Sequence, residues 1–282
     1  MTLDSVVKAI ERFNFLDGMA SSLAGVVGKS VRPRMVRNLL SGTYIGHPLH
    51  PVLSDIPIGA WTMAAFLDLA GGKVSEPAAD ALVAVGIAAA IPTAAAGLND
   101  WSDTEGKPRR IGMFHALVNG SALCFYVGSV FARRFGSRDL GKALGLAGFG
   151  LVTFGGFLGG HLIYADAVNV NKTADRTGPG KWTSIIDHSG LSDGGHRMVE
   201  VGGVSVLLHR SGDTIEAIDA LCSHMGGPLE EGTIENGCVT CPWHGSTFRL
   251  ADGSIVRGPA TRPQPAYEVR TSEGQIQIRR AG

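Results

Sequence analysis

The sequence predicts a chain in two parts, an all-α bundle of four transmembrane helices followed by an all-β domain. Charged residues make up 18% of the chain, against about 25% in soluble domains. Four long apolar runs lie before residue 165, and short alternating segments between turn residues follow them. The expected divisions are a basic amphipathic segment at 1–46, the bundle at 47–166, a linker at 167–181 and the β domain at 182–282.

Charge and cysteine content exclude two classes of protein. The chain has 25 basic and 25 acidic residues, and this zero balance argues against a nucleic acid as partner. Four cysteines in 282 residues are too few for a disulfide scaffold.

The first 46 residues contain an apolar stripe beside basic positions. Val6, Val7, Ile10 and Phe13 lie on the stripe, and Lys8 and Arg12 lie off it. The pattern fits a helix in the membrane interface and fits equally an ordinary amphipathic cap on the bundle.

The four apolar runs span Pro51–Ala70, Ala78–Leu98, Ile111–Ala132 and Ala143–Tyr164. Each is close to the roughly 20 residues that a helix needs to cross a bilayer. Gly155, Gly156, Gly159 and Gly160 give the fourth run the small residues that let membrane helices pack closely. A buried soluble bundle is the alternative, and four such runs in series argue against it.

Lys and Arg near the helix ends predict the orientation, because cytoplasmic loops carry an excess of them. Most of these residues flank the ends that share a side with both termini, which places both termini in the cytoplasm. The loop from Arg133 to Lys142 is the exception.

The segment after Tyr164 has the sequence pattern of a small antiparallel sandwich or barrel. A polar linker leads into short alternating runs with turn signals between them. The expected strands are 204–210, 214–220, 238–241, 246–250, 267–270 and 275–280.

Two tight Cys/His pairs stand inside this β segment. Cys222 and His224 form the first pair, and Cys241 and His244 form the second. Four such ligands admit a Cys₂His₂ zinc site, or a [2Fe–2S] centre with two Cys on one iron and two His on the other.

The two loops, CSHMGGPLEEG at 222–232 and CPWHGSTF at 241–248, resemble those of the Rieske family over roughly Trp182–Arg280. The resemblance implies a [2Fe–2S] cofactor with Cys222 and Cys241 on the inner iron and His224 and His244 on the outer iron. It also implies that Ser246 donates to a bridging sulfur and that Pro259, in GPATRPQP, belongs to the loop that covers the cluster.

Departures from the family pattern indicate the subtype. Respiratory members carry a disulfide-forming Cys where this chain has Gly227 and Trp243, so the chain is more similar to the ferredoxin and oxygenase types. Phe248 replaces the Tyr of high-potential members, and we expect an intermediate-to-low potential. Cys238 is expected to be a buried strand residue rather than a ligand.

The segments GHPLHPVLSDIPIG (46–59), AGLNDW (96–101) and HALVN (115–119) resemble an uncharacterised family of four-helix membrane proteins. This resemblance covers residues 35–166 and implies a fold without an activity.

Polar residues gather at one end of the predicted bundle, the end from which the β domain emerges. They are His47, His50, Asp55, Asp100, His115, Asn119 and His161, with Asn99 and Asp166 beside them. Ionisable residues in a membrane segment usually face a functional interior. His115 and His161 are candidate axial ligands of haem b, a quinone pocket is a second interpretation, and snorkelling or capping is a third. Since prolines flank His47 and His50, we expect extended chain there and a place at the rim of such a site.

These features predict a membrane-anchored electron-transfer protein of the cytoplasmic membrane, with its β domain on the cytoplasmic side. It would relay single electrons between a redox partner protein and a haem b or quinone site in the bilayer. No substrate site is visible, so the chain is expected to be an oxidoreductase component. The alternatives are a tethered ferredoxin whose helices are only an anchor, and a cluster-based redox sensor.

Overall fold

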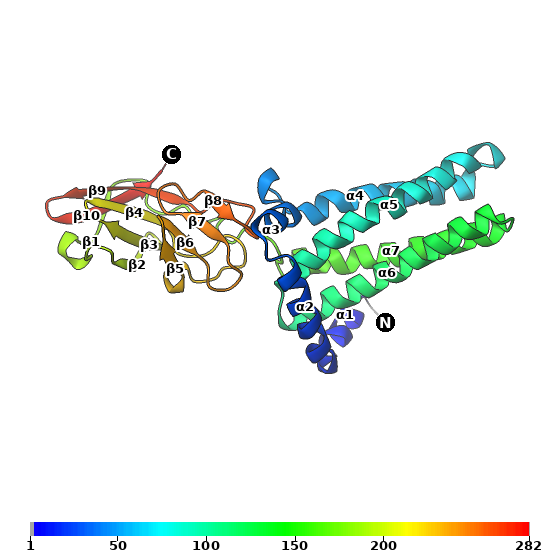
Figure 1. The fold of residues 1–282 in the computed structure, drawn as a ribbon, viewed down its shortest axis with the longest axis horizontal. Coiled ribbons are helices and arrows are strands. Elements are labelled where there is room, and N and C mark those ends of the chain that lie inside the picture. The colour runs from blue at the N-terminus through cyan, green and yellow to red at the C-terminus, as the bar shows by residue number, and fades with distance from the viewer. Residues whose placement is uncertain (1–2, 282) are drawn as a thin grey trace. The chain divides into compact units, whose positions relative to one another are not determined.

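The computed structural model describes residues 3–281, which form two compact units (Figure 1). The first unit contains the residues up to Pro33 together with Pro48–Val168, and the second contains Arg34–His47 together with Asn169 onward. The segment 34–47 therefore belongs to the β unit, although it precedes the long helices in the chain.

Helices make up the first unit. They are α1 (Leu3–Glu11), α2 (Asp17–Ser30), α4 (Leu49–Ala70), α5 (Glu76–Trp101), α6 (Gly106–Arg134) and α7 (Arg138–Tyr164), with short 3₁₀ turns η1 (Asn14–Leu16) and η3 (Lys73–Ser75). Helices α4 to α7 coincide with the four expected apolar runs. All four are long and apolar enough to cross a membrane, which confirms the predicted fold of this half.

Small residues let the bundle pack closely around one aromatic pair. The rings of Trp61 on α4 and Tyr126 on α6 stack with centroids 4.1 Å apart. The Trp61 ring lies directly against Gly86 of α5, and the Tyr126 ring lies against Gly148 of α7. A side chain at Gly86 would collide with the Trp61 ring, and one at Gly148 would crowd the Tyr126 ring, so the high glycine content serves helix packing here.

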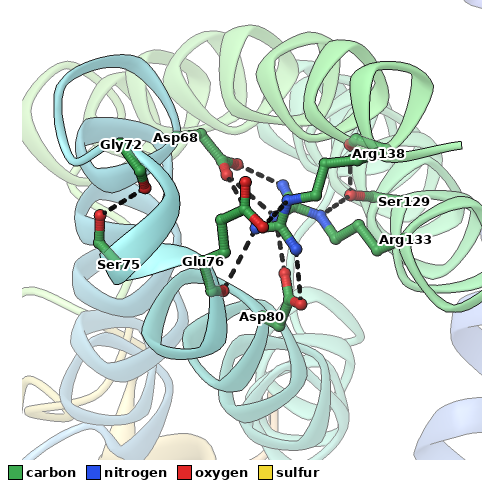
Figure 2. A network of polar contacts seen from close by, with 9 residues as sticks. Asp68, Gly72, Ser75, Glu76, Asp80, Ser129, Arg133 and Arg138 are labelled. Atoms are coloured by element: carbon green, nitrogen blue, oxygen red, sulfur yellow. Dashed lines mark hydrogen bonds and ion pairs between the residues drawn. The ribbon is translucent and has the colours of Figure 1, made fainter. Parts of the chain in front are cut away.

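Ion pairs join all four long helices at the end formed by the α4–α5 and α6–α7 turns (Figure 2). The Arg133 guanidinium of α6 binds Asp68 of α4 and lies 2.9 Å from Oδ1 of Asp80 on α5. Arg138 of α7 reaches Asp80 at 2.8 Å and Glu76 at 3.5 Å. The side chains of Asp68 and Arg133 are both only 3% exposed, so each neutralises the other in a site that excludes water.

The amphipathic α1 packs on the opposite end of the bundle. Val7 and Ile10 are buried in one cluster with Ile111 of α6 and Leu158 of α7. These are two of the apolar-stripe residues, so the stripe of α1 faces the helices rather than solvent.

The second unit is all β apart from its first residues, α3 (Arg34–Ser41) and the 3₁₀ turn η2 (Thr43–Ile45). A six-stranded antiparallel sheet has the order β1-β10-β9-β4-β3-β2, and a four-stranded one has the order β5-β6-β7-β8. The strands are β1 (Thr183–Asp187), β2 (His196–Val201), β3 (Val204–Ser211), β4 (Thr214–Asp219), β5 (Thr233–Glu235), β6 (Cys238–Thr240), β7 (Thr247–Arg249), β8 (Ile255–Arg257), β9 (Ala266–Ser272) and β10 (Gln275–Arg280), with 3₁₀ turns η4 (His188–Gly190) and η5 (Leu229–Glu231).

The four-stranded sheet lies next to both loops that hold the Cys/His pairs: the first loop leads from β4 toward β5, and the second joins β6 to β7. Its core includes Val239 of β6 and Phe248 of β7, both fully buried, together with Leu229 and the two cysteines of the motif. A rigid apolar core thus lies directly behind the loops and fixes the bases from which they project.

Candidate metal centre

The two Cys/His loops have the same backbone design. In the first, the Cys222 N–H donates to the Gly227 carbonyl (2.9 Å) and the Gly226 N–H donates to the Cys222 carbonyl (2.9 Å). In the second, Cys241 makes the matching bonds with Ser246 (2.8 Å) and Gly245 (3.1 Å). Gly226 and Gly245, each four residues after its cysteine, have φ of 81° and 73°, a conformation that glycine adopts without strain.

These loops bring the four predicted residues together as a thiol pair and an imidazole pair. Cys222 and Cys241 are both free and buried, and their thiols hydrogen-bond to each other. The rings of His224 and His244 meet edge to face with centroids 5.2 Å apart. Among residues 3–281, no group of three or more His, Cys, Asp or Glu side chains converges on one point.

The surroundings of the thiols set their ionisation. The hydrogen bond from Cys222, together with the N–H groups of Trp243 and His244, lowers the pKa of Cys241 to about 7. The same contact and burial raise the pKa of Cys222. A thiolate is the form that binds metal. Cys241 therefore ionises easily, whereas Cys222 would lose its proton when the metal binds.

The imidazoles differ in their surroundings. His224 is 7% exposed, whereas His244 is half-buried and lies beside the exposed Trp243, with ring centroids 6.3 Å apart. Burial, followed by the charges of His244, Arg37 and Lys172, lowers the pKa of His224 well below its usual value. His224 is therefore the neutral imidazole that a metal requires.

A glycine makes room beside the thiols. A methyl group at Gly227 would lie 2.7 Å from Sγ of Cys241 and 3.1 Å from the Trp243 ring, so only glycine leaves this side of the thiol pair open. Two soft thiols, two imidazoles and this open side fit a two-iron centre with two protein ligands on each iron.

The loop 258–265 closes the site from a third side. The Ser246 hydroxyl, which is fully buried, accepts the Ala260 N–H at 3.0 Å. Gln264 accepts the Ser223 N–H at 2.8 Å and donates to the Leu221 carbonyl at 2.8 Å. Pro259 lies between Gly258 and Ala260 in this loop, joined to Gly258 by a cis peptide bond. Ser246 and Pro259 were both expected from the sequence to lie near the cluster, whereas Gln264 has no local pattern to mark it.

In the helical unit, the structure brings together His50, His115 and Asn119. The ring centroids of His50 and His115 are 6.1 Å apart. Nδ1 of His50 lies 2.9 Å from the Thr93 carbonyl of α5, and Nδ1 of His115 lies 2.8 Å from the Gly155 carbonyl of α7. Since a carbonyl only accepts, each Nδ1 carries the proton and each Nε2 is the basic nitrogen. Asn119 packs on the His115 ring, 3.4 Å from both of its nitrogens.

Glycines allow both rings to lie against helix backbones. A methyl group at Gly97 would be 2.8 Å from the His50 ring, and one at Gly159 would be 3.1 Å from the His115 ring. The expectation that the chain at His50 is extended is wrong, because α4 begins at Leu49. Pro51 falls in the first turn of α4, where no backbone N–H is needed for the helix.

The other candidates lie elsewhere. His161 is two residues past Gly159, about 200° around α7, and so faces away from His115. It lies close enough to Asp166 to oppose the rise in the Asp166 pKa that burial causes. Asp100 accepts a hydrogen bond from Asn99 at 2.9 Å, and His47 and Asp55 are exposed.

Comparison with known proteins agrees with both halves of the chain. Residues 181–268 match the family described as "Rieske [2Fe-2S] domain", and residues 46–172 match "Predicted membrane protein (DUF2231)". Ferredoxin CarAc of Metapseudomonas resinovorans is 31% identical over 98 residues, which are 34% of this chain and 92% of the relative. The anthranilate 1,2-dioxygenase ferredoxin subunit of Burkholderia cepacia is 35% identical over 77 residues, 27% of this chain and 71% of the relative.

A longer relative and a solved structure match the same part. Apoptosis-inducing factor 3 of Mus musculus is 33% identical over 89 residues, 32% of this chain, and the match spans only 15% of that relative. The ferredoxin of carbazole 1,9a-dioxygenase from Nocardioides aromaticivorans IC177 has 27% identity and a TM-score of 0.34, with 35% of this chain and 97% of that chain covered. The chain belongs to the Rieske [2Fe–2S] family through its β domain, and it carries a DUF2231 predicted membrane domain ahead of it.

Proposed function

We propose that this protein is a membrane-anchored electron carrier that exchanges single electrons between a redox partner protein and the membrane. The observation that carries the proposal is that two loops of the β domain bring two thiols together and two imidazoles together. The same chain carries four helices long and apolar enough to cross a bilayer. The matched relatives support a carrier role, because both are named as ferredoxins and one of them as the ferredoxin subunit of a dioxygenase.

The ligand assignment follows the two pairs. Cys222 and Cys241 would hold the buried iron, and His224 and His244 would hold the outer iron. The cluster supplies one-electron chemistry, and mixed Cys/His ligation gives it a higher potential than all-Cys clusters have. Ser246, fixed by the Ala260 N–H, would direct its hydroxyl proton at the cluster and stabilise its reduced form.

The half-exposed ring of His244 is the proposed point of electron exchange. His224 is buried, whereas His244 and the neighbouring Trp243, which is 56% exposed, present an edge to solvent. An exposed aromatic ring beside a ligand is suited to a protein partner, since aromatic residues are enriched in interfaces. A redox protein of oxygenase type would meet this edge, by analogy with the dioxygenase ferredoxin subunit.

We further propose that the β domain lies on the cytoplasmic side of the cell membrane. The loop that opposes this orientation contains Arg133 and Arg138, and both guanidinium groups are neutralised by Asp68, Asp80 and Glu76. Because these two charges are paired inside the bundle, they weigh less against the excess of Lys and Arg on the side of the termini. That excess favours a cytoplasmic position for the termini. Protease protection tests this: the β domain should be cut in inverted vesicles and protected in intact spheroplasts, and the reverse would contradict it.

The His50–His115 pair favours a second redox site, and we propose haem b as its occupant. Both imidazoles donate Nδ1–H to a backbone carbonyl, which is the arrangement that prepares Nε2 for a metal. The two rings lie close together, with centroids 6.1 Å apart, and His50 and His115 would hold the haem iron, which would supply one-electron chemistry inside the bundle. A quinone pocket is the competing interpretation of the site, and a bundle that serves only as an anchor is the third.

The carrier role is tested with purified protein in liposomes under anaerobic conditions. The visible absorption of the cluster should bleach when dithionite is added and return when an oxidant is added, over repeated cycles. If a lipophilic quinone restores the absorption of the cluster in protein that contains no haem, the membrane site is a quinone site and not a haem site. A cluster that does not cycle reversibly would contradict the carrier role.

A further inference from the structure

A segment encoded ahead of the membrane helices covers the loop that closes the cluster site. Residues 34–47, which comprise α3 and η2, group with the β unit, and we call them the cover segment. Oδ1 of Asn38 accepts the Gly258 N–H at 2.8 Å. The Thr43 hydroxyl donates to the Ala260 carbonyl at 3.0 Å. The cover segment thus holds both ends of the stretch that contains Pro259.

These contacts lead to a predicted ligand through a short series of hydrogen bonds. Ala260, held by Thr43, donates its N–H to the Ser246 hydroxyl at 3.0 Å. The Ser246 carbonyl accepts the Cys241 N–H at 2.8 Å. Displacement of the cover segment would therefore loosen Ser246, which is placed to tune the cluster.

Gly258 shows that the β domain is shaped for this contact. A side chain at Gly258 would collide with the Thr43 hydroxyl and approach Ser41 within 3.7 Å. Gly258 is not among the residues with positive φ, so its backbone does not require glycine. The missing side chain makes room for the cover segment.

The buried face of α3 carries a positive charge close to the imidazole pair. Arg37, Asn38 and Ser41 are all buried, at 4%, 3% and 2% exposure. Arg37 directly precedes Asn38, whose side chain binds the Gly258 N–H beside the cluster loops, and the charge of Arg37 favours the neutral form of His224. Lys172, whose backbone N–H donates to the Ser223 carbonyl at 3.0 Å, adds a second cation beside the loop that carries His224.

We propose that the cover segment is a working part of the cluster site, in which Arg37 raises the reduction potential and the cover leaves His244 as the edge for electron exchange. This rests on the ligand assignment proposed above. A fixed positive charge stabilises the reduced cluster, which carries one more negative charge than the oxidised form. Arg37 is a positioning and tuning residue and is not a ligand.

The test measures the midpoint potential of the full-length protein in detergent by paramagnetic resonance. Arg37→Gln should shift the equilibrium about tenfold toward the oxidised cluster, which is about 59 mV for one electron. Arg37→Lys should restore most of the shift. Arg34→Gln is the matched control, because it removes the same charge from the exposed face of the same helix and should leave the potential unchanged.

The possible outcomes separate this inference from the proposed function. Potentials of Arg37→Gln and wild type that agree within error overturn the tuning role while the cluster assignment stands. A wild-type protein with no Rieske signal overturns the assignment itself. If Arg37→Gln does not assemble the cluster, the role of the cover segment is tested by hydrogen exchange of peptides covering 256–262 in Asn38→Ala. Faster exchange than in wild type supports the cover, and unchanged exchange overturns it.

The opposite face of the cover segment is apolar and exposed, which supports a second inference independently of the first. Met35, Val36, Leu39, Tyr44 and Ile45 are all exposed, and each of them except Val36 is at least 58% exposed. Residues 35, 36 and 39 repeat the i, i+1, i+4 spacing of the buried residues 37, 38 and 41, displaced by two positions. The helix therefore turns its polar face to the β domain and its apolar face outward, the reverse of a soluble helix.

We infer that this apolar face lies in the lipid interface. The cover segment ends at His47, and the first membrane-spanning helix begins at Leu49, so the chain must reach the bilayer surface there. Arg32 is exposed just before the apolar face and suits anionic headgroups.

Photocrosslinking tests the lipid contact. The full chain carrying benzoylphenylalanine in place of Leu39 is reconstituted in vesicles of phosphatidylethanolamine and phosphatidylglycerol. Crosslinks to lipid from position 39, and none from the same group at the exposed Thr271 of β9, are expected. Crosslinks from position 39 to protein alone, or equal lipid labelling at both positions, would overturn the inference.

Discussion

The imidazole rings of His224 and His244 meet edge to face with centroids 5.2 Å apart, although the two residues lie on separate loops. Each loop is closed by backbone bonds to its own cysteine, so the cysteines and histidines are positioned by the same turns. Because the cysteines are buried and His244 reaches the surface, the site has a protected side and an accessible side. This polarity is what an electron carrier needs.

Replacement of a predicted ligand should abolish the cluster. We expect His224→Ala to lose the Rieske paramagnetic resonance signal and the bound iron, because one iron would retain a single protein ligand. His196→Ala, on the exposed strand β2, should keep both. A normal signal in His224→Ala would exclude this residue as a ligand.

Cys238 offers the matching control for the thiols. It is half-buried on β6, three residues before Cys241. Cys241→Ser should lose most of the iron, whereas Cys238→Ser should retain the wild-type iron content. Loss of iron in Cys238→Ser would make it an alternative ligand.

The open side at Gly227 should be required for cluster assembly. Gly227→Ala places a methyl group 2.7 Å from Sγ of Cys241, and we expect the purified variant to contain much less iron and acid-labile sulfide. Gly180→Ala, where the added group meets nothing within 4 Å, should be fully loaded. Equal loading of the two variants would show that the thiol side is not where the cluster sits.

The haem proposal makes a selective prediction. The pyridine haemochrome spectrum should show haem b in the wild type, and both His50→Ala and His115→Ala should lose it because each removes one axial imidazole. His161→Ala should retain it, since His161 faces away from the pair. Absence of haem in freshly purified wild type, grown with sufficient haem supply, would reject this occupant while leaving the β-domain cluster unaffected.

The buried ion pairs of the bundle should dominate its stability. Arg133→Ala leaves Asp68 buried without its main counter-charge, and loss of one partner of a buried pair costs about 3–5 kcal/mol. Arg134→Ala, the exposed neighbour, should change stability by no more than about 0.5 kcal/mol. Thermal unfolding in detergent compares the two, and similar midpoints would show that the network (Figure 2) contributes little.

Much of the fold was predictable because its signals are local. The four apolar runs became α4 to α7, and the six expected strands correspond to β3, β4, β6, β7, β9 and β10. The strands β1, β2, β5 and β8 were missed. Strands β5 and β8 have three residues each, too few for an alternating pattern, and β2 is mostly exposed.

The parts that escaped prediction depend on contacts between distant residues. Asn38 and Gly258 are 220 positions apart, so no local pattern links the cover segment to the cluster loops. The partner of His115 depends on helix rotation, and sequence reasoning chose His161 where the structure places His50. The flanking prolines predict a rim position for His50, yet tertiary contact with Thr93 holds its ring inside the bundle.

The most direct test is the low-temperature paramagnetic resonance spectrum of the reduced, anaerobically purified protein, recorded with its iron, sulfide and zinc content. A Rieske-type spectrum with equal amounts of iron and acid-labile sulfide is the predicted result. Zinc at the four residues, with neither sulfide nor a resonance signal, would contradict the account.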